Sequence, residues 1–166
     1  MLTELNKDDY AELKALFAGD RQVAVHLLDG YQGLKAFLPP PERRGLVLID
    51  SSFDRAREFA RIATALAEAH SRWASGTYAI WYPLMEPGAM RGFARDVKKT
   101  GIRKILRLEL TIEPEDWALT IPGCGMLVVN PPWRFENKAR PLLDWLWRAL
   151  SVEGAGGVKI DWLTPE

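Results

Sequence analysis

Short apolar runs alternate with amphipathic stretches along the chain. The run Leu46–Ile49 is continuously apolar, which is typical of a strand that helices cover on both faces. After it, Phe59, Ile62 and Leu66 recur at the spacing of one helix face. The whole pattern predicts helices over residues 8–18, 31–37, 55–73, 87–99 and 135–150, and strands over residues 23–28, 46–49, 77–83, 103–112, 126–129 and 158–163.

This order of elements predicts an α/β fold with a doubly wound, mostly parallel sheet of the Rossmann type. Each crossover between parallel strands places its helix over a face of the sheet. Two predicted strands follow each other directly after residue 102, which indicates an antiparallel edge at the carboxyl end. Pro141 should bend the last helix or mark a new start. A chain of 166 residues, 48% of them apolar, suits one domain over residues 1–166.

Charge and cysteine content narrow the function classes. The 22 basic and 22 acidic side chains cancel, so a nucleic acid would have to be met by a local patch. Cys124 is the only cysteine, which excludes an internal disulfide and a cysteine-caged metal site and suits a reducing cytoplasm. No segment has 18 uninterrupted apolar residues. We therefore expect a soluble cytoplasmic protein without a metal site.

Acidic residues stand where predicted strands end, and ligands of open α/β sheets bind outside the carboxyl ends of the strands. Glu4 follows a short apolar stub and is placed like the carboxylate that binds ribose hydroxyls in nucleotide-binding sheets. A solvated charge or a helix-start residue is the alternative. Asp29 ends a strand, and Gly30 would let the backbone pass close to a flat ring. A turn in which Asp29 caps a helix is equally consistent with these residues.

The tetrapeptide Asp50-Ser51-Ser52-Phe53 has the residue types that methylation of an exocyclic amine requires. Such an amine is a poor nucleophile because its lone pair is delocalised into the base. A carboxylate that accepts its N–H, with a neighbouring backbone carbonyl, keeps positive charge from building up on the nitrogen. The ring of Phe53 could stack on the extruded base. The alternative has Asp50 and a serine as helix cap and Phe53 in the core.

Two further features are weaker. Residues 130–133, Asn-Pro-Pro-Trp, look like a methylase motif, but they follow an edge-type strand and their prolines also serve to end a strand before a helix, so we interpret them as structural. A set of basic residues could form a rim that contacts RNA phosphates, although a solvated helix end and strand edge would explain them equally well. These residues are Arg43, Arg44, Lys98, Lys99, Arg103, Lys104 and Arg107.

The order of these segments resembles the bacterial RlmJ family, whose members use S-adenosylmethionine to methylate N6 of an adenine in 23S ribosomal RNA, the large-subunit rRNA. The resemblance rests on residues 2–5, 29–34, 38–40, 43–50, 76–83, 100–106 and 125–133 and extends over the whole chain. It implies that Glu4 holds the cofactor ribose and that Asp29 and Gly30 lie at the cofactor adenine. It also implies that Asp50 borders the cofactor and is the catalytic acid, with Phe53 in place of the family's tyrosine.

Two departures from the family modify this expectation. The family begins well upstream of the position that matches Met1, with a first strand, a Gly-rich cofactor turn and a basic segment. Ser51 and Ser52 replace two prolines that would restrict the loop after the catalytic acid. The hypothesis is therefore a class I methyltransferase-like domain that is truncated and impaired. The alternative is an inactive remnant that oligomerises through an exposed sheet edge or binds protein or nucleic acid.

Overall fold

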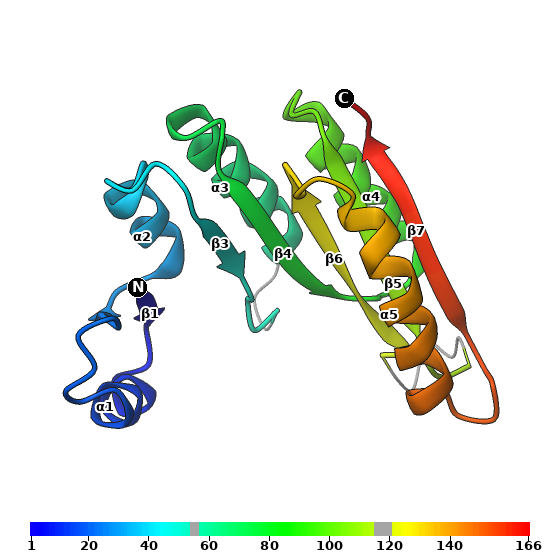
Figure 1. Cartoon of the computed structure of the whole chain (residues 1–166), viewed down its shortest axis with the longest axis horizontal. Coiled ribbons are helices and arrows are strands. Elements are labelled where there is room, and N and C mark those ends of the chain that lie inside the picture. The colour runs from blue at the N-terminus through cyan, green and yellow to red at the C-terminus, as the bar shows by residue number, and fades with distance from the viewer. Residues whose placement is uncertain (54–56, 115–120) are drawn as a thin grey trace.

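The computed structural model describes residues 1–53, 57–114 and 121–166, which form a mixed α/β fold (Figure 1). Its helices are α1 (Lys7–Leu16), α2 (Gly30–Phe37), α3 (Glu58–Arg72), α4 (Pro87–Lys99) and α5 (Phe135–Leu150). Its strands are β1 (Leu2–Glu4), β2 (Val25–Leu27), β3 (Leu46–Ile49), β4 (Thr77–Pro83), β5 (Ile105–Thr111), β6 (Gly123–Val129) and β7 (Gly157–Thr164). The predicted elements are confirmed, and the part of the predicted 55–73 helix before residue 57 lies outside the described residues.

The strands form two sheets instead of one. β1 and β2 make a parallel pair, and the larger sheet has the order β3-β4-β6-β5-β7. Only β3 and β4 are parallel in the larger sheet, because β6 runs antiparallel to both β4 and β5, and β7 runs antiparallel to β5. The prediction of a mostly parallel sheet is therefore wrong. The predicted antiparallel edge is confirmed, and it makes up most of this sheet.

The connection between β5 and β6 explains the antiparallel arrangement. A parallel pair needs a crossover of a dozen or more residues, usually a helix, whereas antiparallel neighbours can be joined directly. Residues 112–122 are too few for such a crossover. β6 therefore returns beside β5, pairing Leu110 with Cys124, and its other edge then pairs with β4.

Helices cover both faces of the larger sheet. On one face, α3 and α4 pack over a core that includes Ile62, Phe93 and the fully buried Tyr78. On the other face, α5 covers Leu106 and Val128 through Ala139 (Figure 1). The helix α5 runs through Pro141, so the predicted break at that residue is wrong.

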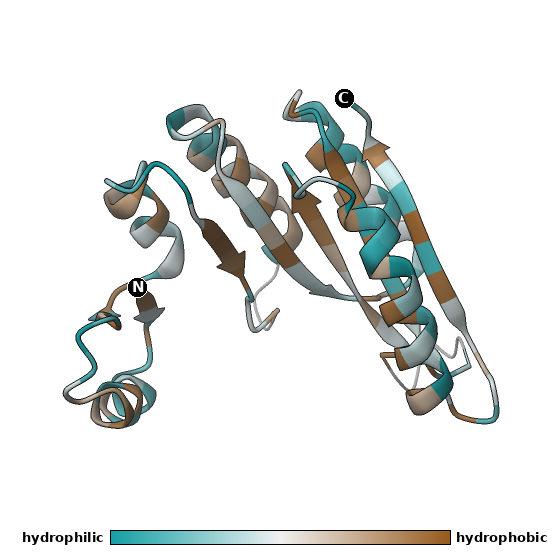
Figure 2. Ribbon diagram, in the orientation of Figure 1, coloured by the Kyte–Doolittle hydropathy of each residue, from teal (hydrophilic) through white to brown (hydrophobic). Residues whose placement is uncertain are grey.

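Strands β1 and β3 each have a partner on one side only among the described residues. All four residues of β3 are apolar, as Figure 2 shows. Ile49 and Val47 pack toward the core under α3, whereas Leu46 and Leu48 point to the other face and are 65% and 61% exposed. Among the described helices, one face of β3 alone is covered, so the prediction that helices cover both faces of this strand is wrong. None of the described helices is long and apolar enough to span a bilayer.

Candidate functional site

The carboxyl ends of β1 and β2 bring Glu4 and Asp29 to one edge of the small sheet. The strands are parallel, with Glu4 opposite Leu27, and the amide of Leu28 donates to the Glu4 carbonyl at 3.0 Å. Two of the predicted site residues are therefore neighbours, although 25 positions separate them in the sequence.

The Glu4 carboxylate is partly used by its own backbone. Its Oε1 accepts from the amides of Leu5 and Asn6 at 2.6 and 2.7 Å. Asn6 in turn caps α1, so Glu4 orders the turn into that helix, as its helix-start interpretation expects. The atom that a ligand would meet is the second oxygen, Oε2, of this half-buried side chain.

Asp29 caps α2, so the alternative proposed from the sequence is realised in the structure. Its Oδ1 accepts from the amides of Tyr31 at 2.9 Å and Gln32 at 3.4 Å. Its Oδ2 lies 3.7 Å from the guanidinium of Arg61 on α3. Capping uses one oxygen and leaves the other turned toward α3, so capping and ligand binding do not exclude each other.

Gly30 stands where α2 passes close to β1. A Cβ at Gly30 would lie 3.4 Å from Oγ1 of Thr3, and one at the buried Gly33 would lie 3.0 Å from Cγ2 of the same residue. Small residues here let the first turn of α2 approach the strand that carries Glu4.

Asp50 and Phe53 follow the carboxyl end of β3. Asp50 is exposed to solvent, directly after the buried Ile49. Phe53 has a left-handed backbone with a φ of 54°, and its half-buried ring packs 5.1 Å from the ring of Phe59 and 5.9 Å from that of Trp81. The aromatic ring thus borders the core, while the acid beside it points into water.

Glu58 connects these two regions and is not among the residues that the sequence predicted for the site. Its Oε1 accepts from the hydroxyls of Tyr31 at 2.5 Å and Ser51 at 2.6 Å, and its Oε2 accepts from Arg61 at 2.9 Å. Tyr31 adjoins Gly30, and Ser51 adjoins Asp50. The available signal was an acid four residues before Ile62, on the buried face of an amphipathic helix.

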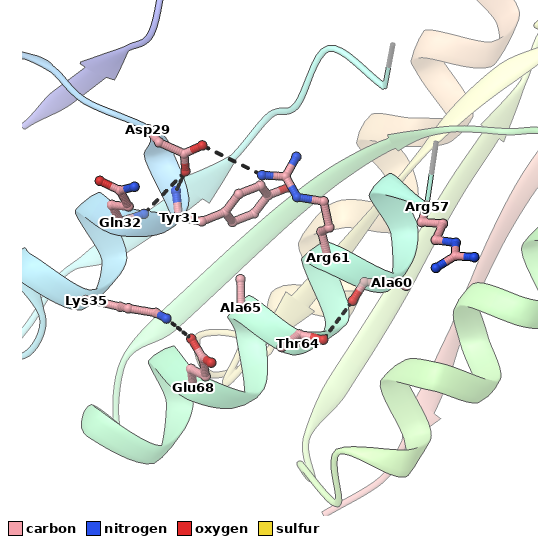
Figure 3. A pocket seen from close by; sticks show the side chains of 10 residues that line it. All are labelled: Asp29, Tyr31, Gln32, Lys35, Arg57, Ala60, Arg61, Thr64, Ala65 and Glu68. Carbon is pink, nitrogen blue, oxygen red and sulfur yellow. Dashed lines mark hydrogen bonds and ion pairs between the residues drawn. The ribbon is translucent and has the colours of Figure 1, made fainter. Parts of the chain in front are cut away.

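An open pocket of about 460 Å³ lies between α2 and α3 (Figure 3), and its lining includes Tyr31 and Arg61, two partners of the Glu58 carboxylate. Asp29 and Arg61 stand at one end of the pocket, and the ion pair between Lys35 and Glu68, 2.8 Å apart, stands at the other. The guanidinium of Arg61 also lies 4.7 Å from the centre of the Tyr31 ring, within the range of a cation–π contact. The pocket is lined by charged and polar groups of both signs.

The second motif, residues 130–133, lies at the opposite end of the strands from Asp50, in the large sheet. β6 is antiparallel to β4, so Asn130 follows the pairing of Val129 with Tyr78, near the amino end of β4. The Asn130 side chain donates to the carbonyls of Ala74 and Gly76, both at 2.8 Å. Our structural interpretation of this motif is confirmed.

The predicted basic rim also lies away from Asp50. The amide of Asn130 donates to the carbonyl of Lys104. The amide of Thr77 donates to the carbonyl of Gly45, the residue that follows Arg43 and Arg44. Both contacts are at the amino ends of β3 and β4. Arg107 is bound by Asp161 on β7, with two hydrogen bonds of 2.8 and 2.5 Å. Arg43, Arg44 and Lys104 thus lie at the end of the strands opposite Asp50, and their role as a rim that contacts RNA phosphates stays a prediction.

No cluster of three or more His, Cys, Asp and Glu side chains able to hold a metal ion occurs in residues 1–53, 57–114 and 121–166. The groups available at the site are therefore carboxylates, hydroxyls, guanidinium groups and an aromatic ring. Such groups bind hydroxyls, amines and a flat base.

Comparison with known proteins gives the chain a family. A family model described as "Ribosomal RNA large subunit methyltransferase D, RlmJ" matches residues 1–164. The chain is 40% identical over 166 residues to the "Ribosomal RNA large subunit methyltransferase J" of Haemophilus influenzae, and 39% identical over 165 residues to the protein of the same name from Escherichia coli. These alignments cover 100% and 99% of the chain and 59% of each relative.

The fold has a solved counterpart. The crystal structure of a protein from Legionella pneumophila superposes with a TM-score of 0.85 at 32% identity, covering 96% of this chain and 58% of that one. The chain thus spans somewhat over half the length of the proteins it matches. Both the sequence match over residues 1–164 and the shared fold lead to one conclusion: the chain belongs to the RlmJ family of ribosomal RNA large-subunit methyltransferases.

Proposed function

We propose that this chain carries the catalytic part of an S-adenosylmethionine-dependent methyltransferase that acts on N6 of an adenine in ribosomal RNA. The observation that carries the proposal is the exposed Asp50 at the carboxyl end of β3, linked through Ser51 and Glu58 to the turn that holds Asp29. The family's class I methyltransferase-like domain, its cytoplasmic location and its RNA substrate belong to the same proposal.

The acidic residues fit the cofactor's polar groups. Glu4 keeps its Oε2 after Oε1 has accepted two backbone amides, and Asp29 keeps an oxygen beyond the helix cap. Carboxylate oxygens of this kind accept ribose hydroxyls or an adenine amine. Glu4, Asp29, Gly30 and Asp50 would hold S-adenosylmethionine, which supplies the methyl group.

Asp50 would accept the N–H of the target amine, so that positive charge on the nitrogen is compensated as the methyl arrives. Phe53 would offer its ring to the flipped base, a contact of about 1–3 kcal/mol in comparable sites. Its ring already packs against Phe59 and Trp81, so stacking would use the face that these neighbours leave open. The resulting stack would fix the base beside Asp50.

Titration calorimetry with S-adenosylhomocysteine tests the cofactor crevice. Loss of a hydrogen bond to a charged group, about 1.5–3 kcal/mol, predicts that Asp29→Ala weakens binding by roughly 10–150-fold. The matched control is Asp20→Ala, which removes a similar bond: the Gln22 amide donates to Oδ1 of Asp20 at 2.8 Å, before the start of β2. Absence of saturable binding by the unmodified chain at millimolar ligand would refute the proposal, as would equal weakening by both variants.

Methyl transfer to an unmodified 23S ribosomal RNA transcript tests the catalytic acid. Asp50→Asn keeps the size of the side chain and loses the carboxylate, so we expect the rate to fall by about 10²-fold or more. The unmodified chain should itself be slower than the whole Haemophilus influenzae relative, because no described strand joins β1 to β3 and two serines follow Asp50. A rate that is unchanged in Asp50→Asn would remove Asp50 from the mechanism.

A second candidate function rests on the open edges of β1 and β3. Unpaired strand edges accept strands from other chains, and Leu46 and Leu48 add exposed apolar surface beside one of them. We infer that the chain can associate with itself or with another protein through this edge, whether or not it is active. Sedimentation velocity across a wide concentration range should show a concentration-dependent dimer, and a strictly monomeric profile would contradict self-association.

A further inference from the structure

Glu58 is the only buried acidic or basic side chain found among the residues that the structure describes, at 4% exposed. Burying a carboxylate is costly unless hydrogen-bond donors surround it. Among the described residues Glu58 has three: the hydroxyls of Tyr31 and Ser51 on Oε1, and the guanidinium of Arg61 on Oε2. The two O–H···O distances, 2.5 and 2.6 Å, are in the range of strong bonds to an ionised acceptor.

The electrostatics agree with an ionised Glu58. Burial alone would raise the pKa of this carboxyl, but the hydrogen bonds from Ser51, Tyr31 and Arg61 outweigh it and leave the pKa below its usual value. Burial and the neighbouring Glu58 raise the pKa of the Tyr31 hydroxyl, so that group remains a donor. The carboxylate therefore stays an acceptor for both hydroxyls at neutral pH.

One carboxylate thus fastens three segments at one point. Tyr31 belongs to the first turn of α2, which follows β2, and Ser51 belongs to the connection that follows β3. Glu58 itself begins α3. Since β2 and β3 lie in different sheets, no backbone ladder within the described part of the chain holds their carboxyl ends together, and the hydrogen bonds to Glu58 connect them instead.

We propose that Glu58 is a positioning residue that holds Asp50 in its reactive geometry by anchoring the hydroxyl of Ser51. This inference rests on the proposed methyltransferase function. Proline restricts a loop by locking φ, whereas a serine leaves φ free and needs another constraint. In this chain the constraint is the 2.6 Å bond from the Ser51 hydroxyl to a buried, fully partnered acceptor. The serines after Asp50 are therefore compatible with an ordered loop.

Ser51→Ala is the direct test, because it removes one hydroxyl from the surface of the site and leaves Glu58 two donors. Amide hydrogen exchange at residues 50–53 reports how often the loop opens. We expect exchange there to rise by about tenfold, and methyl transfer to fall by a similar factor, from loss of one bond to a charged group. The affinity for S-adenosylhomocysteine should fall by less than the rate does, because Glu4, Asp29 and Gly30 are untouched and only the contact made by Asp50 is loosened. The matched control, Ser71→Ala, removes another serine hydroxyl bond, 2.7 Å to the Glu68 carbonyl at the far end of α3.

Two further variants separate positioning from general stability. Glu58→Gln in the Ser51→Ala background should add little to the loss of rate, because the anchor has already gone. Replacing Ser51 and Ser52 together by proline should restore loop protection and make the rate insensitive to Glu58→Gln. The comparison does not depend on whether Glu58→Gln folds on its own, because Ser51→Ala and the proline pair carry it.

The outcomes distinguish the two proposals. If the unmodified chain binds no S-adenosylhomocysteine, the methyltransferase proposal fails, while the exchange data still decide whether Glu58 orders the loop. If Ser51→Ala leaves both the exchange at residues 50–53 and the rate at the level of Ser71→Ala, the positioning role of Glu58 is overturned. If exchange rises and the rate falls in Ser51→Ala, but the additional loss of rate from Glu58→Gln is fully additive, the proposal is also overturned, because Glu58 then acts on the site by a route other than Ser51.

Discussion

Replacing Asn130 with alanine separates the two motifs that the sequence presents. The side-chain amide of Asn130 donates to the carbonyls of Ala74 and Gly76 at 2.8 Å each, and the residue has a left-handed φ of 50°. Two hydrogen bonds contribute about 1–3 kcal/mol together. An alanine at positive φ costs about 1 kcal/mol more. We therefore expect the free energy of unfolding to fall by about 2–4 kcal/mol in Asn130→Ala.

Urea unfolding followed by tryptophan fluorescence measures this loss. Asn130→Gly is the matched variant, because it loses the same two hydrogen bonds and tolerates the positive φ. It should be more stable than Asn130→Ala by about 1 kcal/mol. Binding of S-adenosylhomocysteine, measured at a temperature where both variants are folded, should match that of the unmodified chain. A variant with full stability and no ligand binding would refute the reasoning and return Asn130 to the candidate site.

Three other substitutions test the fold around the site. Gly125→Ala would push a Cβ into the ring of the buried Tyr82, so thermal unfolding should show a loss of about 1–3 kcal/mol, and an unchanged melting temperature would contradict that contact. Arg107 lowers the pKa of Asp161, so their pairing stabilises the fold above the ordinary pKa of 3.8, and this stabilisation is lost as pH falls through the lowered pKa. Asp161→Asn should therefore lower the free energy of unfolding by about 0.2–1 kcal/mol at pH 7 and leave it unchanged at the acid limit. Urea unfolding at each pH measures the difference. Leu48→Lys should change stability by less than about 0.5 kcal/mol and abolish any dimer seen in sedimentation, because Leu48 is 61% exposed.

The elements of the fold were readable from the sequence because their signals are local. β3 and α4 begin and end at the predicted residues, since a continuous apolar run and a helix begun by proline and followed by Gly101 depend only on near neighbours. The order of strands was not readable in the same way. The position of β6 between β4 and β5 depends on pairings across the chain, and no local pattern distinguishes that order from a parallel one.

The same distinction between local signals and contacts across the chain applies to the candidate site. Glu4, Asp29 and Asp50 were found because each stands at the end of a strand, and the structure places all three at carboxyl ends of strands. Glu58 was missed because its partners, Tyr31 and Ser51, come from other segments, and only the packing of α2 against α3 brings them together. The location of the basic residues was not readable from the sequence for a related reason, since the end of the sheet at which Lys104 lies is decided by the direction of β5.

The geometry of the site depends on side chains to an unusual degree. Within each sheet, backbone ladders fix the position of a strand end, but Asp29 and Asp50 follow strands of different sheets. The contacts between α2 and α3 connect these two strand ends. They are the hydrogen bond of Tyr31 to the Glu58 carboxylate, the approach of Arg61 to Asp29 at 3.7 Å, and the more exposed ion pair of Lys35 and Glu68. Exposed ion pairs contribute about 0–1 kcal/mol, so the buried carboxylate bears most of this coupling. The residue on which the spacing of the two acids depends most is therefore Glu58, which lies outside both tetrapeptides.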